Sequence, residues 1–248
     1  MKPTLLCSLL VLCAASFANA APVQVAVAAN VQYAFADIAA SFSRDTGIAV
    51  QPSFASSGKF ATQIMNGAPF ELFLSADNEF PQKLAQAGFT LQAPKSYALG
   101  ALVLWSKDPQ FNTRQWQQWL AAGSGKVAIA NPRTAPYGSE ALRVLDHYRL
   151  SASVTPRLVS GDNIAQAAQF VDSGAAQAGF VAKALVLAPQ MRDVGRWVDI
   201  PAASHQPIVQ DMVLLKPAAA NPDARKLYDY LSGPAARQIL QRYGYRLP

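Results

Sequence analysis

The chain has 248 residues, of which 51% are apolar and 15% charged, with a formal net charge of +6, two cysteines and two histidines. This length fits one large domain or two small ones, and the low charged fraction argues against a disordered chain. Both cysteines fall within the first twenty residues, so a disulfide framework for the fold is excluded. The positive charge suggests an anionic partner, either a nucleic acid or a small anion.

The first twenty residues have the three parts of a secretory signal peptide. Lys2 supplies the basic start, residues 5–15 are apolar, and Ala18-Asn19-Ala20 is a cleavage signal. The apolar run is shorter than the roughly 20 residues that span a membrane. The sequence therefore predicts signal peptide 1–20 and an exported protein. Cleavage would remove Lys2 and both cysteines, which lowers the formal net charge to +5.

Strands and helices are predicted to alternate over the first part of the exported chain. Val31, Phe35, Ile38 and Phe42 recur at helical spacing, and Gly47 is a typical stop for that helix. The predicted elements in chain order are a strand at 23–28, a helix from Val31, a strand at 48–54, a helix through Phe60 and Ile64, a strand at 71–74 and a helix to Gly88.

A second block follows with the same alternation. Its predicted strands are 101–105, 127–130, 158–160, 178–181 and 207–215, and its predicted helices are 116–122, one through Leu142 and Leu145, one through Ile164 and Val171, and two within 222–243 that are separated at Ser232-Gly233-Pro234. Strands joined by single helices indicate parallel βαβ units and an α/β fold. No linker divides the blocks, so two domains would share a hinge through crossing strands near Gly100 and near Pro207.

Four strand-to-helix junctions are small and polar: Ala29-Asn30, Ser56-Ser57-Gly58, Pro136-Tyr137-Gly138 and Asp162-Asn163-Ile164. Ligands of open α/β sheets bind beyond the carboxyl ends of the strands, where the helices begin. Such junctions can direct unpaired N–H groups at an anion. Each also has a simpler explanation, because Asn30 and Ser57 are good helix caps, worth about 1 kcal/mol apiece. Gly58 would let a ligand approach the backbone closely.

Other chemistries have little support. His147 and His205 have no partner at zinc-ligand spacing, and no glycine-rich nucleotide motif occurs. The basic residues are scattered, which disfavours nucleic-acid binding. A secreted hydrolase that uses Ser57 stays as an alternative, although no nucleophile-elbow motif surrounds this serine.

The chain resembles the periplasmic molybdate-binding proteins of ABC importers over essentially its whole exported length. The resemblance rests on VAVAAN at 25–30, FASSGKFATQIMNGAPFELFLSAD at 54–77, NPRTAPYG at 131–138, GDNIAQAAQFV at 161–171 and YDYLSGPAARQILQRYGY at 228–245. It implies a type II periplasmic binding protein fold, in which two Rossmann-like α/β lobes, residues 21–101 with 208–248 and residues 102–207, are joined by two crossing strands.

The same resemblance implies a function and a site. The protein would be a monomer in the periplasm that captures molybdate, and also tungstate, without a cofactor, and delivers it to a membrane permease. Asn30, Ser57, Tyr137 and Ile164 match the family's neutral donors to the anion. Some members have a tyrosine where this chain has Ala182, so that contact is absent here or is replaced by another group such as Tyr137. A binder of another oxyanion or of a small acid is the alternative within the same fold.

Overall fold

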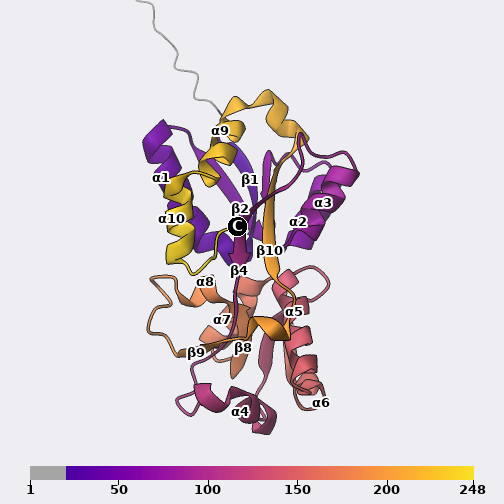
Figure 1. Ribbon diagram of the computed structural model, residues 1–248, viewed down its shortest axis with the longest axis vertical. Helices are drawn as coiled ribbons and strands as arrows, with labels where there is room; N and C mark the ends of the chain where they lie inside the picture. Colours follow the sequence, from indigo (N-terminus) through magenta and orange to yellow (C-terminus); the bar gives the residue numbers. More distant parts are fainter. Residues whose placement is uncertain (1–20) are drawn as a thin grey trace, which may run out of the picture.

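The computed structural model describes residues 21–248, so the predicted signal peptide, with Cys7 and Cys13, lies outside the described residues. The described chain forms two lobes, one above the other along the long axis of the molecule (Figure 1). Each lobe is built on its own five-stranded sheet. Lobe 1 contains the first strand and the C-terminal helices, and lobe 2 contains the middle of the chain. The two α/β lobes confirm the predicted fold class.

The sheet of lobe 1 is mixed. Its strands are β1 (Val23–Ala28), β2 (Val50–Ala55), β3 (Leu72–Leu74), β4 (Lys95–Gly100) and β10 (Ile208–Leu214), in the order β2-β1-β3-β10-β4. β1 pairs in parallel with β2 and β3, whereas β10 pairs antiparallel with β3 and β4. β1 and β3 are almost wholly buried, as expected for strands with helices on both faces.

Helices cover both faces of this sheet. They are α1 (Gln32–Thr46), α2 (Ser57–Met65), α3 (Glu79–Gln86), α9 (Pro222–Leu231) and α10 (Pro234–Arg242). On one face, α1 packs Phe35, Ile38 and Phe42 into the core that it shares with α9 and α10. On the other face, α2 and α3 enclose a smaller core around Phe73. α1 ends as predicted at Gly47, whose φ of 73° lets its N–H reach the carbonyl of Ser43.

Lobe 2 repeats this arrangement. Its strands are β5 (Leu102–Ser106), β6 (Val127–Ala130), β7 (Leu158–Gly161), β8 (Ala178–Ala182) and β9 (Arg196–Asp199), in the order β7-β6-β8-β5-β9. Its helices are α4 (Trp116–Ala122), α5 (Pro136–His147), α6 (Ser151–Val154), α7 (Ile164–Asp172) and α8 (Lys183–Val186). β6 pairs in parallel with β7 and β8, and β5 pairs antiparallel with β8 and β9. Trp105 is fully buried and donates from Nε1 to the carbonyl of Val194 at 2.7 Å.

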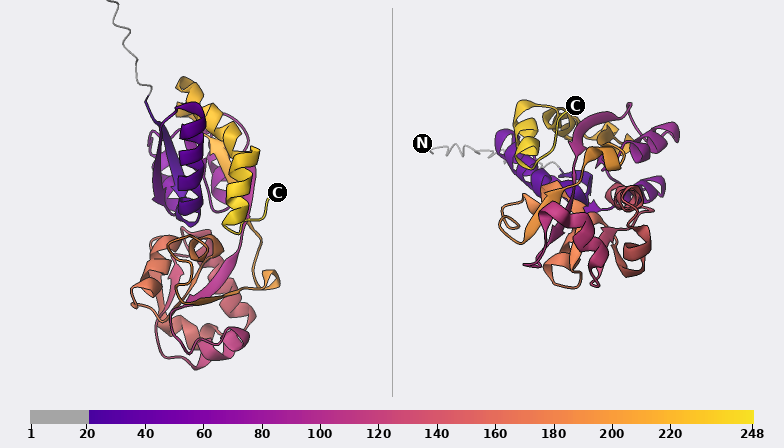
Figure 2. Two further views of the ribbon diagram at one scale, coloured as in Figure 1. Left: turned by 90° about the vertical axis from the view of Figure 1, so that its left-hand side faces the viewer. Right: turned by 60° about the horizontal axis from the view of Figure 1, so that its bottom comes forward.

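The chain crosses between the sheets twice. The first crossing runs from β4 through Ala101 into β5, and the second runs from β9 through residues 200–207 into β10. In the left view of Figure 2 these segments run along one side of the molecule. The crossings lie together, because Gly100 pairs with Ile208. A side chain at position 100 would collide with the Tyr137 hydroxyl, so only glycine fits at this point.

Two strands were missing from the predicted pattern, and both have a physical reason. β4 continues through a single residue into β5, and the predicted pattern took only residues 101–105 of this continuous run as a strand, although it placed a crossing near Gly100. β9 is an edge strand with exposed Arg196 and Asp199 at its ends, so it lacks the apolar signature of a buried strand. The prediction of parallel units was also incomplete. β5 and β10 run antiparallel to their neighbours, because the chain enters them by crossing between lobes instead of through a helix.

Within residues 21–248, no helix has the length and apolar character that crossing a membrane requires.

A buried carboxylate beside the second crossing gives a testable pH dependence. Asp211 is 5% exposed and accepts a 2.6 Å hydrogen bond from the Ser96 hydroxyl. Burial raises the pKa of Asp211 above its ordinary value, so the ionised carboxylate opposes folding at neutral pH, and this effect fades as the pH falls through the raised pKa. Asp211→Asn keeps an acceptor for Ser96 and removes the charge. We expect its free energy of unfolding at pH 7 to equal or exceed that of wild type, with a difference that shrinks toward pH 4.

Denaturant unfolding at both pH values measures this difference. Ser96→Ala is the matched control, because it leaves the carboxylate buried without its hydroxyl partner and should lower stability at pH 7. An Asp211→Asn protein less stable than wild type at pH 7 would contradict the assignment.

Candidate functional site

A small cavity lies between the two lobes. Four chain segments line it: residues 28–30 and 55–57 from lobe 1, and residues 135–137 and 163–164 from lobe 2, with Ala76 at one side. All four residues predicted as donors line this one cavity. They are Asn30, Ser57, Tyr137 and Ile164. The tertiary structure thus brings together positions up to 134 residues apart along the chain.

Helix starts form most of the cavity wall. α2 begins at Ser57, α5 has Pro136 at its first position, and α7 begins at Ile164. The fourth segment is a 3₁₀ turn, η1 (Ala29–Val31), which leads from β1 into α1. The first N–H groups of a helix have no acceptor within the helix, and together they carry the positive end of its dipole.

The cap of α7 shows how one N–H is left for the cavity. The side-chain oxygen of Asn163 accepts from the N–H groups of Ala165 and Gln166, at 2.9 and 3.0 Å. The N–H of Ile164 donates to no acceptor within residues 21–248, and neither do those of Ser57 and Tyr137. Three backbone donors from three helices therefore stay available at the cavity.

The hydroxyl of Ser57 is oriented by a backbone group. Ser57 is 1% exposed, and its Oγ accepts from the N–H of Ala76 at 2.9 Å. Because the oxygen accepts that bond, the hydroxyl proton is free to be donated elsewhere. Ala76 follows β3, and its contribution could not be read from the sequence because it acts through the backbone alone.

The amide of Asn30 is buried and only partly bonded. Its Nδ2 donates to Gln210 Oε1 and to the Tyr245 hydroxyl, each at 2.9 Å. Its Oδ1 has no partner, and it is the one buried side-chain nitrogen or oxygen in residues 21–248 of which this is true. The sequence did not single out Gln210, Tyr97 or Tyr245. Only the fold shows that these residues, from β10, β4 and the C-terminal end, meet beside Asn30.

Tyr137 contributes its backbone N–H to the cavity, while its hydroxyl lies in the polar cluster with Gln210. That hydroxyl accepts from Gln210 Nε2 at 3.0 Å. Ala182, where some family members have a tyrosine, is fully buried at the end of β8. Because the Tyr137 hydroxyl accepts this bond, its own proton is not used in it. That this hydroxyl replaces the missing tyrosine stays a prediction.

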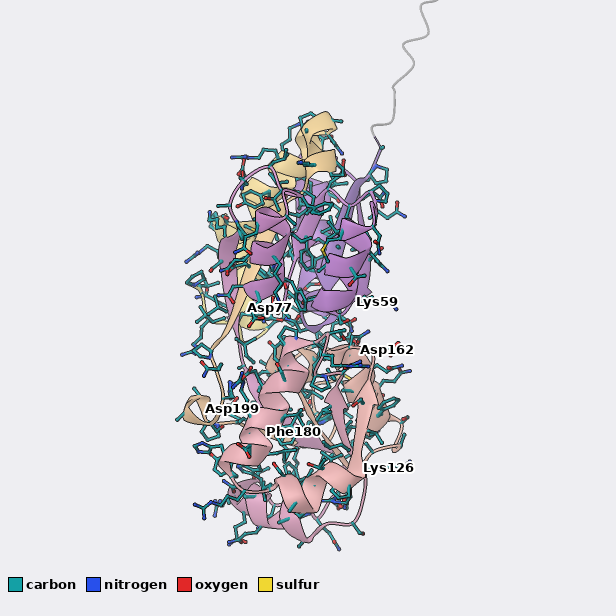
Figure 3. The ribbon with its side chains drawn as sticks, turned by 90° about the vertical axis from the view of Figure 1, so that its right-hand side faces the viewer. Lys59, Asp77, Lys126, Asp162, Phe180 and Asp199 are labelled. Carbon is teal, nitrogen blue, oxygen red and sulfur yellow. The ribbon has the colours of Figure 1, made fainter. Side chains whose placement is uncertain are left out.

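The cavity is neutral. Each side chain that lines it is uncharged, and the lining contains no His, Asp or Glu. Burial raises the pKa of the Tyr137, Tyr97 and Tyr245 hydroxyls, so all three stay protonated at neutral pH. Charged groups lie farther out. Figure 3 shows Lys59 and Asp77 at the edge of lobe 1 that faces lobe 2, with Asp162 at the opposite edge.

The lobes touch directly beside the cavity, at Gly58. Its N–H donates to the carbonyl of Thr134 in lobe 2 at 2.9 Å. A Cβ on Gly58 would lie 2.8 Å from Phe80 Cζ and 3.0 Å from Thr134 Cα. The sequence predicts the approach of a ligand to the backbone at Gly58. In the structure the backbone of the other lobe, at Thr134, lies against this glycine instead.

No group of three or more His, Cys, Asp or Glu residues that could hold a metal ion occurs in the described part of the chain. The Ser57 hydroxyl has the Ala76 N–H as its partner instead of a basic side chain. The site thus offers oriented neutral donors, an arrangement suited to binding an anion.

Comparison with known proteins identifies the family of this chain. A family model described as bacterial extracellular solute-binding protein matches residues 23–246. The molybdate-binding protein ModA of Azotobacter vinelandii is 44% identical over 231 residues, which cover 93% of this chain and 92% of that protein. The ModA protein of Rhodobacter capsulatus is 40% identical, covering 92% of this chain and 89% of its own. The solved structure of the Azotobacter vinelandii periplasmic molybdate-binding protein superposes with a TM-score of 0.85 and 37% identity, over 91% of this chain and 99% of that one.

Proposed function

The chain belongs to the bacterial extracellular solute-binding protein family, and on that premise we propose that it captures molybdate between its lobes and delivers it to the membrane permease of an ABC importer. The observation that carries this proposal is the convergence of unpaired N–H groups from three helix starts on one neutral cavity. In this proposal the donors are Ser57, through its N–H and hydroxyl, the N–H groups of Tyr137 and Ile164, and the side chain of Asn30.

Neutral donors suit a tetrahedral dianion. A hydrogen bond to a charged acceptor contributes about 1.5–3 kcal/mol, so several together can replace the water around the anion. Because the donors are fixed by helix starts in both lobes, they favour anions whose oxygens reach both sides at once. Molybdate and tungstate have the same charge and shape and would bind alike. Sulfate, with shorter bonds, would leave donors unsatisfied.

The other parts of the proposal concern how the protein works in the cell. It would be exported to the periplasm, in accord with the family's extracellular role and with the predicted signal peptide. It would act as a monomer, because all segments that line the cavity come from one chain. Closure of the lobes would trap the anion, and reopening would release it to the permease.

The first prediction concerns the anion. Titration calorimetry of the protein with molybdate, tungstate, sulfate and phosphate should show tight binding of the first two and none of the others. Heat from sulfate or phosphate alone would favour the alternative, a binder of another oxyanion. No heat from any of the four would rule the proposal out.

The second prediction concerns Ser57. Ser57→Ala removes a donor to the anion and the acceptor for the Ala76 N–H. We expect molybdate affinity to fall about 10- to 100-fold, while the circular dichroism spectrum stays that of the folded protein. The matched control is Ser53→Ala, an exposed serine on the adjoining strand β2. Unchanged affinity in Ser57→Ala would remove this residue from the site.

The third prediction concerns closure. In Gly58→Ala the added methyl group would meet Phe80 and the backbone of Thr134, so the lobes cannot approach as closely. We expect about tenfold weaker molybdate binding and a smaller decrease in the radius of gyration on binding, measured by small-angle X-ray scattering. Lys59→Ala, at the next and exposed position of α2, is the control. A wild-type response from Gly58→Ala would show that this contact does not limit closure.

A further inference from the structure

A cluster of buried amide and hydroxyl groups lies beside the cavity, at the place where β10 enters lobe 1. Gln210 is at its centre and is fully buried. Its Oε1 accepts from Asn30 Nδ2 and from the Tyr97 hydroxyl, both at 2.9 Å, and its Nε2 donates to the Tyr137 hydroxyl at 3.0 Å. A single side chain thus contacts two cavity residues, Asn30 from lobe 1 and Tyr137 from lobe 2.

The backbone beside this amide departs from regular pairing. The register of β10 against β4 shifts between Gln210 and Asp211, because Tyr97 of β4 is an extra residue with no partner on β10. Bulges commonly redirect a side chain beside a functional site. On the partner strand, Gly100 leaves the space that the Gln210 amide and the Tyr137 hydroxyl occupy. Both features lie on β4, the strand that pairs with Gln210.

The hydrogen bonds of the cluster do not balance in this orientation of the two amides. Tyr97 has one hydroxyl proton but lies within hydrogen-bond distance of two acceptors, the carbonyl of Ser75 at 3.0 Å and Gln210 Oε1 at 2.9 Å. Asn30 Oδ1 is buried without a donor. Gln210 Oε1 keeps the proton from Asn30 Nδ2 even when Tyr97 donates to Ser75, so the acceptor that goes without a proton is Asn30 Oδ1, on a residue that lines the cavity.

A half turn of both amides keeps the same heavy-atom contacts and exchanges the donors and acceptors. Gln210 Nε2 then donates to Asn30 Oδ1 and to the Tyr97 hydroxyl, which in turn donates to Ser75. The Tyr137 hydroxyl donates to Gln210 Oε1. Every acceptor then has a proton: the Tyr245 hydroxyl donates to the carbonyl of Asn30, and Asn30 Oδ1 accepts from Gln210 Nε2. Asn30 Nδ2 becomes the free group, and a free donor is what an anion in the cavity requires.

We propose that Gln210 is a positioning and specificity-determining residue: it holds the Asn30 amide with its oxygen toward the cluster and its NH₂ toward the cavity when the anion is bound. This inference rests on the proposed function, and it explains why the site offers the anion hydrogen-bond donors and no acceptor. An anion that carries a proton, such as hydrogenphosphate, needs an acceptor, and the oriented amide withholds the one side-chain oxygen of Asn30. Fully deprotonated dianions such as molybdate lose nothing by this arrangement.

The first test compares Gln210→Met with wild type. Methionine keeps the length and bulk of glutamine but neither donates nor accepts at that point, so the Asn30 amide is no longer held. We expect molybdate affinity to fall about tenfold or more, and displacement of molybdate by phosphate at mildly alkaline pH to become easier. Ser96→Ala is the control, because it removes a partly buried hydrogen bond between the same two strands without touching the cluster, and should leave both properties unchanged.

Equal affinity and equal selectivity in Gln210→Met and wild type would overturn the inference. If wild type itself does not bind molybdate, it is the proposed function that fails. If Gln210→Met does not fold, neutron diffraction from deuterated wild type with molybdate decides the question. Deuterium on the Asn30 atom nearest the anion supports the inference, and a bare oxygen there overturns it.

Discussion

The N–H groups at the first turns of α2, α5 and α7 need acceptors, and the fold directs the N-termini of these three helices toward one point between the lobes. The helices do not supply those acceptors, and the Asn163 cap satisfies only the second and third N–H of α7. The junction of the lobes is therefore rich in donors before any side chain is considered. The neutral lining follows from this, because dipoles and oriented N–H groups already favour an anion without lysine or arginine.

Two glycines allow the lobes to come together around these donors. Gly100 lies at the crossing from β4 to β5, where the Tyr137 hydroxyl of lobe 2 reaches into lobe 1. Gly58 lies on α2, where its N–H meets the carbonyl of Thr134. Each is a place where backbone or buried polar groups of one lobe contact the other directly. Such contacts make closure depend on steric fit as well as on the bound anion.

The net positive charge suggests that basic residues bind an anionic ligand, but the lining of the cavity contains no lysine or arginine. The charged residues near the junction, Lys59, Asp77 and Asp162, carry both signs and lie outside the cavity lining. In the proposed function, specificity instead depends on hydroxyl and amide groups whose protons are placed by burial and by neighbours. The raised pKa values of Tyr97, Tyr137 and Tyr245 keep those hydroxyls neutral, so the polar cluster beside Asn30 stays a network of protonated donors and acceptors at neutral pH.

Local patterns in the sequence were enough to predict the α/β class, the helix faces such as Phe35-Ile38-Phe42, and the four polar junctions, because periodicity and capping act over a few residues. The resemblance to a known family then selected Asn30, Ser57, Tyr137 and Ile164 among the residues of these junctions. The tertiary structure decided what no local pattern holds: that β5 and β10 run antiparallel to their neighbours, that Gly58 contacts the opposite lobe, and that Gln210, Tyr97 and Tyr245 lie beside the Asn30 amide. These contacts join residues up to 215 positions apart, and their geometry exists only once both sheets have formed and the crossing strands have brought the lobes together.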